Sequence, residues 1–330
     1  MSSRKIATFA VLAILFSLHL GFSEEAALEI VRINDRSKAN GPKVLAILAH
    51  PDDETVFAAS LYKTSTHLNG SCDILLITNG EGGFKYSTLA ESLYGLELTK
   101  EEIGRKELPA IRKKEFVKGC RYMKIRQAFF LNQKDHRYSL DPNEVFKADP
   151  PVWDLKKVKL LIDNIVSKGD YDYVFTHLPV SSTHAHHKCA SILALESLSK
   201  LPESKRPTIL GAQVSSATRP AQAFLKLDEF PATEVLPKTE FRFDRRQSFG
   251  YKNKLNYKIV VDWVISEHKS QGTMQLYAHQ GDEEVFYFYK MNSESKLKST
   301  ETYFNRLKEP QFQSKTYGPS AGIEKKELKK

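Results

Sequence analysis

Short apolar runs alternate with longer segments of helical spacing along most of the chain. Residues 43–49 form an almost continuous apolar run, with the length and composition of a strand buried on both faces. The pattern predicts further strands at residues 73–78, 127–131, 171–176, 208–214 and 285–289. It predicts helices at residues 56–63, 101–120, 155–167 and 184–199. Strands that alternate with helices predict an α/β fold, with a mostly parallel sheet covered by helices on both faces.

Four features fit this alternation less well. Pro109 lies inside the longest predicted helix and is expected to break or restart it. Residues 257–270 are rich in β-branched side chains and are expected to begin as a strand and continue as a helix. Residues 24–40 are charged and unpatterned, which indicates a linker or an edge segment. Residues 291–330 are polar and basic, and we expect them to form a loosely ordered tail.

The N-terminus has the organisation of a secretory signal. Arg4 and Lys5 precede an apolar run from Ile6 to Leu20, and small residues follow in the segment 21–23. This run is shorter than the roughly 20 apolar residues that a membrane span needs. We therefore expect residues 1–23 to be a signal peptide and the protein to be exported, either periplasmic or secreted. The alternative is that the segment is retained as a membrane anchor.

Charge and cysteine content narrow the functional classes. The formal net charge is +9, but no basic stripe interleaved with aromatic residues accompanies it, so nucleic-acid binding is not expected. The three cysteines, Cys72, Cys120 and Cys189, are odd in number and widely spaced. This spacing is not that of a disulfide framework, and we expect all three in the core.

Histidines and a carboxylate follow two of the predicted strands. His50 and Asp53 lie three residues apart where a helix opens, and His184 and His187 have the same spacing at the start of another helix. Because the carboxyl ends of parallel strands meet at one edge of a sheet, these side chains are expected to converge. Together they offer two or three imidazoles and one carboxylate. A catalytic zinc typically takes three such protein ligands and keeps one position open for water.

Asp52 directly precedes Asp53, and the side chains of these two consecutive residues are expected to point in different directions. Zinc lowers the pKa of a bound water to about 7, and a carboxylate that is not a ligand can take its proton. Asp52 is therefore predicted to be the general base of a hydrolase. Each cluster alone also fits a simpler structure. Residues 51–54 fit a helix start with favourable acidic residues, and the histidines of segment 184–187 fit a polar helix face.

The segment 49–54, Ala-His-Pro-Asp-Asp-Glu, resembles the signature of the PIG-L/LmbE-like zinc-dependent de-N-acetylases, the N-acetylglucosaminyl-phosphatidylinositol de-N-acetylase family. Three more elements resemble motifs of that family: Thr-Asn-Gly-Glu at 78–81, Arg-Lys-Lys-Glu at 112–115 and His-Lys-Ser-Gln at 268–271. The resemblance implies a Rossmann-like fold and a single catalytic domain, which we place at residues 41–290.

The resemblance also implies a role for each candidate residue. It implies that His50, Asp53 and His187 bind Zn²⁺, with Fe²⁺ or another divalent ion as the alternative. It makes Asp52 the general base and His184 the residue that stabilises the oxyanion. The implied reaction is hydrolysis of the acetamide of an N-acetylated amino sugar or glycoconjugate.

The second histidine motif departs from the family pattern. The family usually has His-Pro-Asp-His, whereas this chain has His184-Ala185-His186-His187. The outer histidines are retained, but the missing aspartate removes a carboxylate that would support the site. His186 becomes a second candidate ligand beside His187, and we favour His187.

Two other functions remain open. The altered second motif is consistent with a catalytically silent carbohydrate-binding protein on the same scaffold. Two histidines and one carboxylate also match the ligands of non-haem Fe(II) oxygenases, although the α/β alternation argues against the jelly roll that those enzymes usually have. A nucleotide site is not indicated, because the glycine-rich segment 80–83 is not the dinucleotide fingerprint.

Overall fold

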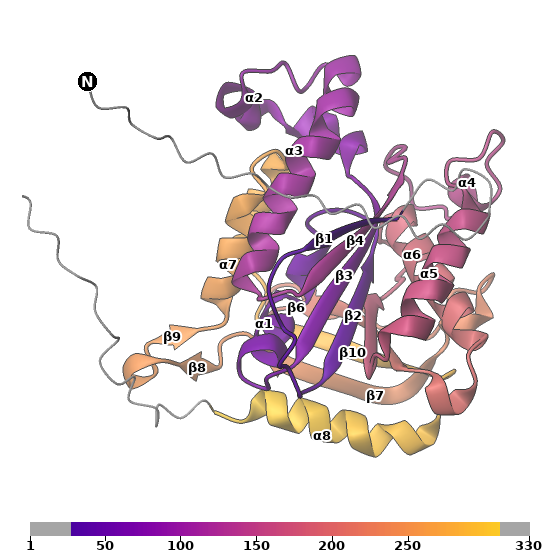
Figure 1. The fold of residues 1–330 in the computed structure, drawn as a ribbon, viewed down its shortest axis with the longest axis vertical. Helices are drawn as coiled ribbons and strands as arrows, with labels where there is room; N and C mark the ends of the chain where they lie inside the picture. Colours follow the sequence, from indigo (N-terminus) through magenta and orange to yellow (C-terminus); the bar gives the residue numbers. More distant parts are fainter. Residues whose placement is uncertain (1–27, 311–330) are drawn as a thin grey trace, which may run out of the picture.

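An eight-stranded sheet forms the centre of the fold, with strand order β1-β4-β3-β2-β5-β6-β10-β7 (Figure 1). The computed structural model describes residues 28–310, so the expected signal peptide at residues 1–23 lies outside the described residues. The strands of this sheet are β1 (Glu29–Arg32), β2 (Lys43–Leu48), β3 (Ser71–Thr78), β4 (Gln127–Gln133), β5 (Tyr173–His177), β6 (Thr208–Ser215), β7 (Val235–Asp244) and β10 (Glu283–Tyr289). A separate two-stranded sheet pairs β8 (Ser248–Phe249) with β9 (Leu255–Asn256).

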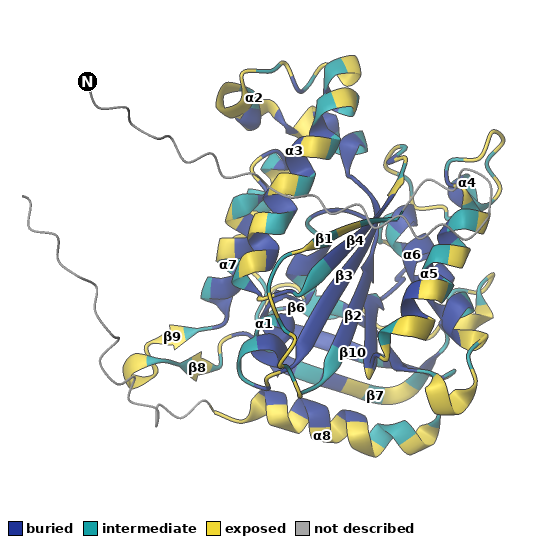
Figure 2. Ribbon diagram, viewed as in Figure 1, coloured by how far each residue is buried: buried dark blue, intermediate teal, exposed yellow. Residues whose placement is uncertain are grey.

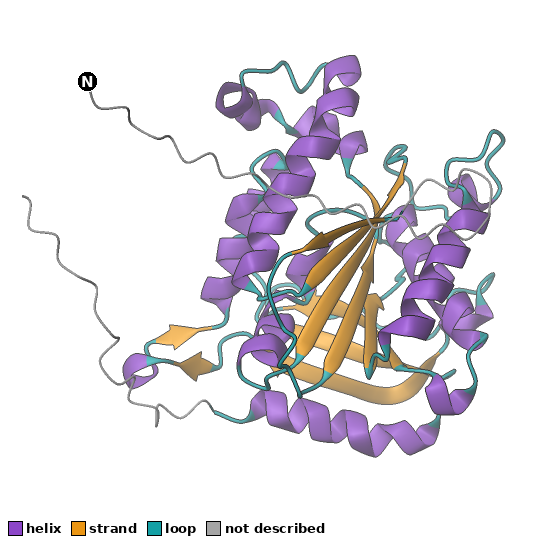
Figure 3. Cartoon of the chain, viewed as in Figure 1, coloured by secondary structure: helices purple, strands orange, loops and turns teal. Residues whose placement is uncertain are grey.

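Helices cover both faces of the sheet (Figure 3). The α-helices are α1 (Ala58–Thr66), α2 (Thr88–Tyr94), α3 (Glu101–Tyr122), α4 (Asn143–Phe146), α5 (Leu155–Gly169), α6 (Ala185–Ser199), α7 (Lys258–Glu267) and α8 (Leu297–Lys308). Three of the short 3-10 helices matter for the site: η1 (Asp53–Val56), η2 (Glu81–Tyr86) and η6 (Gly272–Tyr277).

Five neighbouring strands, β4, β3, β2, β5 and β6, are parallel. Among these five, the chain order across the sheet is 3-2-1-4-5, as in Rossmann-like folds. Strand β1 adds antiparallel to β4, and β10 runs antiparallel between β6 and β7. The predicted fold class is therefore confirmed: a mostly parallel, Rossmann-like sheet with helices on both sides.

The alternation of side chains along β2 divides the core into two layers. Val44, Ala46 and Leu48 face the layer of α1, α3 and α7, whereas Leu45 and Ile47 face the layer of α5 and α6. The central strands β2 and β3 are buried on both faces, whereas the outer strands β1 and β7 are partly exposed (Figure 2).

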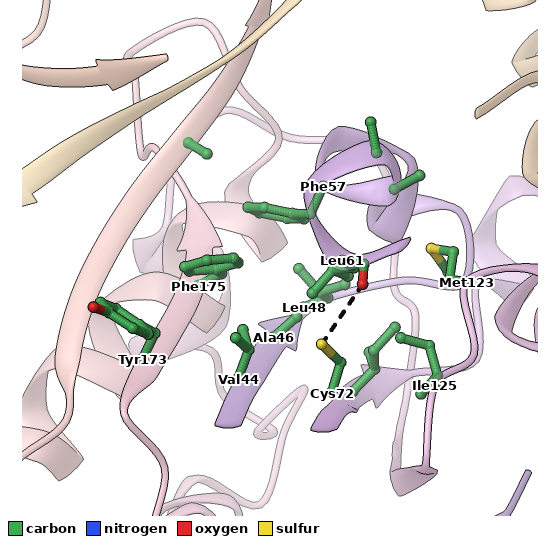
Figure 4. Close-up of a cluster of buried hydrophobic side chains, with 14 of the residues drawn as sticks. Val44, Ala46, Leu48, Phe57, Leu61, Cys72, Met123, Ile125, Tyr173 and Phe175 are labelled. Carbon is green, nitrogen blue, oxygen red and sulfur yellow. Dashed lines mark hydrogen bonds between the residues drawn. The ribbon is translucent and has the colours of Figure 1, made fainter. Parts of the chain in front are cut away.

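Figure 4 shows the first of these layers, where the β2 side chains pack with aromatic rings and with Cys72. The Cys72 Sγ lies 3.8 Å from the carbonyl oxygen of Leu61. Like Cys72, Cys120 and Cys189 are buried and free, as the sequence predicts.

Two predictions about helices are wrong. Helix α3 continues through Pro109, because Leu108 and Ile111 on either side of the proline are buried against η2 and the segment after α2. This packing outweighs the lost hydrogen bond. Residues 258–267 form helix throughout, because Val260, Val261, Val264 and Ile265 lie on one buried face at helical spacing.

Both ends of the predicted domain extend further than expected. Residues 29–32, in the segment 24–40 that was expected to be a linker or an edge segment, form the edge strand β1. Residues 297–308, placed in the tail 291–330, form α8, which buries Thr300, Tyr303, Phe304 and Leu307. These four residues follow helical spacing, and the many charges between them hid that period. No helix within residues 28–310 is long and apolar enough to cross a membrane.

Candidate metal centre

Strands β2 and β5 bring the two histidine clusters to the same edge of the sheet. They are parallel neighbours with Val44 opposite Tyr173, so their carboxyl ends lie side by side. His50 follows the end of β2, and His184 is the N-cap of α6, beyond the end of β5. The fold thus brings His50 close to His187, which lies 137 positions further along the chain.

His50, Asp53 and His187 present ligand atoms to one point. The Nδ1 of His50 lies 3.1 Å from Nε2 of His187 and 3.7 Å from Oδ2 of Asp53, and His187 Nε2 lies 3.0 Å from Asp53 Oδ1. Ligand atoms about 2.0–2.2 Å from a tetrahedral zinc are roughly 3–3.5 Å apart. These three residues therefore fit a zinc ion, and the same donors also suit Fe²⁺ and other divalent transition metals.

The backbone fixes the orientation of Asp53. The N–H groups of Ala49 and His50 donate to Oδ2 of Asp53 at 3.0 and 2.9 Å, which leaves Oδ1 directed at His187. Burial alone would raise the pKa of Asp53, but His187 and His177 nearby hold this pKa well below its ordinary value. Asp53 is therefore ionised, which is the form that binds a metal.

The other ring nitrogen of His187 also has a partner. Its Nδ1 lies 2.9 Å from the hydroxyl of Thr183, and an Nδ1–H donated to that oxygen leaves the Nε2 lone pair free for an ion. The ring of His177 packs edge-on against His187 at 4.4 Å and lines the same cavity.

His184 is held as a neutral imidazole. Its Nδ1 accepts a hydrogen bond from the backbone N–H of His186 at 2.9 Å, so the ring proton belongs on Nε2. Burial, with the neighbouring imidazoles of His50 and His186, lowers the pKa of His184 to about 2. The ring lines the cavity, beside Tyr138. An oxyanion would therefore meet a neutral N–H donor at His184, not an imidazolium.

Asp52 occupies an unusual backbone conformation. Its φ is 122°, a backbone angle that residues other than glycine rarely adopt. The backbone N–H of Asp52 donates to Oε2 of Glu54, and its carbonyl accepts from the hydroxyl of Thr55. Burial, followed by the adjacent negative charge of Asp53, raises the pKa of Asp52 to about 7. The side chain lines the cavity, so a carboxyl group able to exchange a proton near neutral pH faces the ligand cluster.

A buried network joins the other family-like motifs to this turn. His268 Nε2 lies 2.5 Å from Glu54 Oε1, and both side chains are fully buried. Gln271 donates to the carbonyl of Pro51. One residue before Gln271, Ser270 donates from its hydroxyl to Oε2 of Glu115 at 2.6 Å. The motifs at residues 112–115 and 268–271 thus form a buried hydrogen-bond network that holds residues 51–54 in position.

The sequence missed Asp135, which faces His50 from the side opposite Asp53. Its Oδ1 lies 3.7 Å from His50 Nε2 and 3.2 Å from His186 Nδ1. The backbone N–H of Asp135 donates to Oε1 of Glu81, so Glu81 supports the loop that carries Asp135. Asp135 follows β4 at the same edge of the sheet as His50, and that position was the signal available in the sequence.

His186 does not share the position of His187. It is 2% exposed, its Nδ1 lies 3.1 Å from His50 Nε2, and its ring packs against Trp153. His50, His184 and His186 are also close enough to hold an ion. Nδ1 of His184 accepts the N-cap bond and Nε2 carries the ring proton, so His184 could bind an ion through either nitrogen only by giving up that bond. This favours the set of His50, Asp53 and His187.

The ligand cluster opens into a cavity of about 1000 Å³. All five residues singled out from the sequence line it: His50, Asp52, Asp53, His184 and His187. Three tyrosines, Tyr86, Tyr138 and Tyr277, contribute to its outer wall and are partly exposed. A cavity of this size and mixed polarity suits a small organic substrate.

Several solved structures are similar to this chain at low sequence identity. N,N'-diacetylchitobiose deacetylase from Pyrococcus horikoshii has 22% identity and a TM-score of 0.38, and the match covers 54% of this chain and 63% of that one. The A40926 pseudoaglycone deacetylase Dbv21 has 15% identity and a TM-score of 0.48, with 77% and 99% covered. GalB, a 4-carboxy-2-hydroxymuconate hydratase from Pseudomonas putida KT2440, has 12% identity and a TM-score of 0.47, with 74% and 95% covered.

No curated protein sequence matches the chain. Residues 45–198 match the family model of PIG-L, GlcNAc-PI de-N-acetylase. This segment runs from β2 to α6 and contains Asp52, His184 and the three ligand residues. The segment that matches this family model, residues 45–198, thus contains the complete candidate site.

Proposed function

We propose that this protein is a metal-dependent N-deacetylase, which hydrolyses the acetamide of an N-acetylated amino sugar or glycoconjugate. The observation that carries the proposal is the convergence of His50, Asp53 and His187, with separations of 3.0–3.7 Å, at the floor of the cavity. The match of residues 45–198 to the family model of PIG-L, GlcNAc-PI de-N-acetylase, supports the choice of an acetylated sugar.

The three ligand residues would hold Zn²⁺. When bound, such an ion supplies Lewis-acid polarisation of the acetyl carbonyl and lowers the pKa of a water molecule. Asp52 would take the proton from the attacking water, and a pKa of about 7 suits a base that works at neutral pH.

His184 would act on the carbonyl oxygen of the acetyl group. Attack on the carbonyl carbon pushes negative charge onto the acetyl oxygen, and the neutral Nε2–H of His184 can donate to that oxyanion. Collapse of the tetrahedral intermediate breaks the C–N bond. Protonated Asp52 can return its proton to the nitrogen, so that the products are acetate and the free amine.

The test combines metal analysis with amine release. The purified protein is expected to contain or bind one divalent ion, and to release amine from at least one member of a panel of N-acetylglucosamine conjugates. A chelator should stop amine release and added Zn²⁺ should restore it. Asp53→Asn should lose both the ion and the activity, while Asp141→Asn, in an exposed loop, should keep both. Undiminished turnover in metal-free protein would refute the proposal.

A further inference from the structure

The ring of His50 has two differently occupied sides. Its Nδ1 faces Asp53 and His187, whereas its Nε2 faces Asp135 and His186. A neutral histidine that binds an ion through Nδ1 must carry its proton on Nε2. The group that accepts this proton fixes the rotation of the ring and strengthens the ligand.

Asp135 is held rigidly against this second side. Its Oδ2 accepts a hydrogen bond from the N–H of Gly82 at 3.0 Å, and its backbone carbonyl accepts from Arg105 at 2.8 Å. A Cβ added at Gly82 would lie 2.8 Å from the carboxyl carbon of Asp135, so the glycine allows the loop to approach this closely. With Oδ2 occupied, Oδ1 is the oxygen left to face His50.

His186 completes the arrangement from α6. It lies between Trp153, with ring centroids 5.0 Å apart, and Asp135, whose Oδ1 is 3.2 Å from Nδ1 of His186. An ionised carboxylate only accepts hydrogen bonds, so His186 must present an N–H at Nδ1. That nitrogen then has no lone pair for the proton of His50. Asp135 Oδ1 is the carboxylate oxygen that faces this proton, and at 3.7 Å the contact is an ion-pair contact, longer than a hydrogen bond.

We propose that Asp135 is the positioning residue for His50, and that it supplies from β4 the carboxylate support lost with His186. The proposal rests on the metal centre proposed above. In this proposal the glycine-rich loop holds Asp135 in place, because Glu81 and Gly82 both form hydrogen bonds with Asp135. It also explains how the departure at position 186 leaves the ligand set intact.

Zn²⁺ affinity, measured by competition with a chromophoric chelator, tests this role without an assay of turnover. Asp135→Asn keeps the size of the side chain but can turn an N–H₂ towards His50, and we expect Zn²⁺ binding to weaken by about 10–100-fold. Asp141→Asn, the matched exposed control, should bind as the wild type does. Thermal unfolding of the metal-free variants checks that each is folded.

A second-site rescue separates positioning from a general structural effect. His186→Asp places a carboxylate beside His50 from helix α6, so the substitution should recover part of the lost Zn²⁺ affinity when it is added to Asp135→Asn. Equal affinity in wild type and Asp135→Asn would overturn the inference alone, as would a double variant no better than Asp135→Asn. Failure of the wild type to bind Zn²⁺ would overturn the proposed metal centre, and this inference with it.

Discussion

The Nδ1 of His184 accepts a hydrogen bond from the backbone N–H of His186, and this bond caps helix α6. One contact thus sets the tautomer of a candidate catalytic residue and starts the helix that carries His187. The cap explains how His184 can offer an N–H at Nε2 while its pKa lies far below neutrality.

We expect His184→Ala to lower kcat by about 10²–10³-fold, because a donor to the developing oxyanion is lost. Zn²⁺ affinity should change little, since His184 is not among the ligands. His184→Asn can cap α6 through its side-chain oxygen, and it separates the loss of the cap from the loss of the ring. Steady-state kinetics and metal titration measure both effects. Loss of the ion in His184→Asn would show that His184 is a ligand.

Asp52→Asn should abolish general-base catalysis while the ion stays bound. We expect turnover to fall by about 10²–10⁴-fold, because the amide cannot take a proton from water. Asp53→Asn is the informative comparison, because it should lose the ion as well. Metal content measured beside amine release distinguishes the two. A metal-free Asp52→Asn protein would make Asp52 a ligand.

Helix α8 should be essential for stability. Phe304 is 1% exposed and packs against Phe241 and Phe286, with ring centroids 5.0 Å away in each case. Phe304→Ala should therefore lower the free energy of unfolding by about 3–5 kcal/mol. Asn305→Ala, on the exposed side of the same helix, should change it by about 0.5 kcal/mol or less. Urea unfolding tests both, and similar midpoints for the two variants would contradict the packing of α8.

His67 predicts a specific dependence of stability on pH. Burial, together with nearby Lys63, lowers the pKa of His67 to about 4 from 6.5. The unfolded chain therefore binds more protons than the native state between about pH 4 and 6.5, and the stability contributed by this site rises with pH across that window. His67→Gln, which can still accept from the hydroxyl of Tyr257, should show a flatter profile of urea midpoint against pH. An unchanged slope would exclude His67 as a source of this dependence.

The sequence predicted the parallel sheet and the convergence of the candidate ligand residues, because both depend on local pattern. A strand buried on both faces appears in the sequence as an apolar run. Motif residues that follow parallel strands must meet at the edge of the sheet where the carboxyl ends of those strands lie. Asp135 could not be assigned in the same way. Its role depends on the position of β4 next to β3, and on a contact with His186 from a distant helix.

Helices α3 and α8 were misjudged for a related reason. Pro109 breaks isolated helices, but here burial of Leu108 and Ile111 decides the outcome. In α8, Tyr303, Phe304 and Leu307 gain most of their stabilisation from the sheet they cover, and charged neighbours conceal their period. Tertiary packing stabilises both helices, and the contacts that provide it are difficult to predict from a single sequence.

Both outer strands of the main sheet are poor templates for further pairing. Strand β1 has only four residues. Strand β7 carries Pro237, which has no N–H, followed by Lys238 at a φ of 58°, and its register with β10 shifts at this point. Short outer strands, proline and charged side chains discourage another copy from extending a sheet. The protein should therefore resist strand-mediated aggregation at the concentrations that metal titrations require.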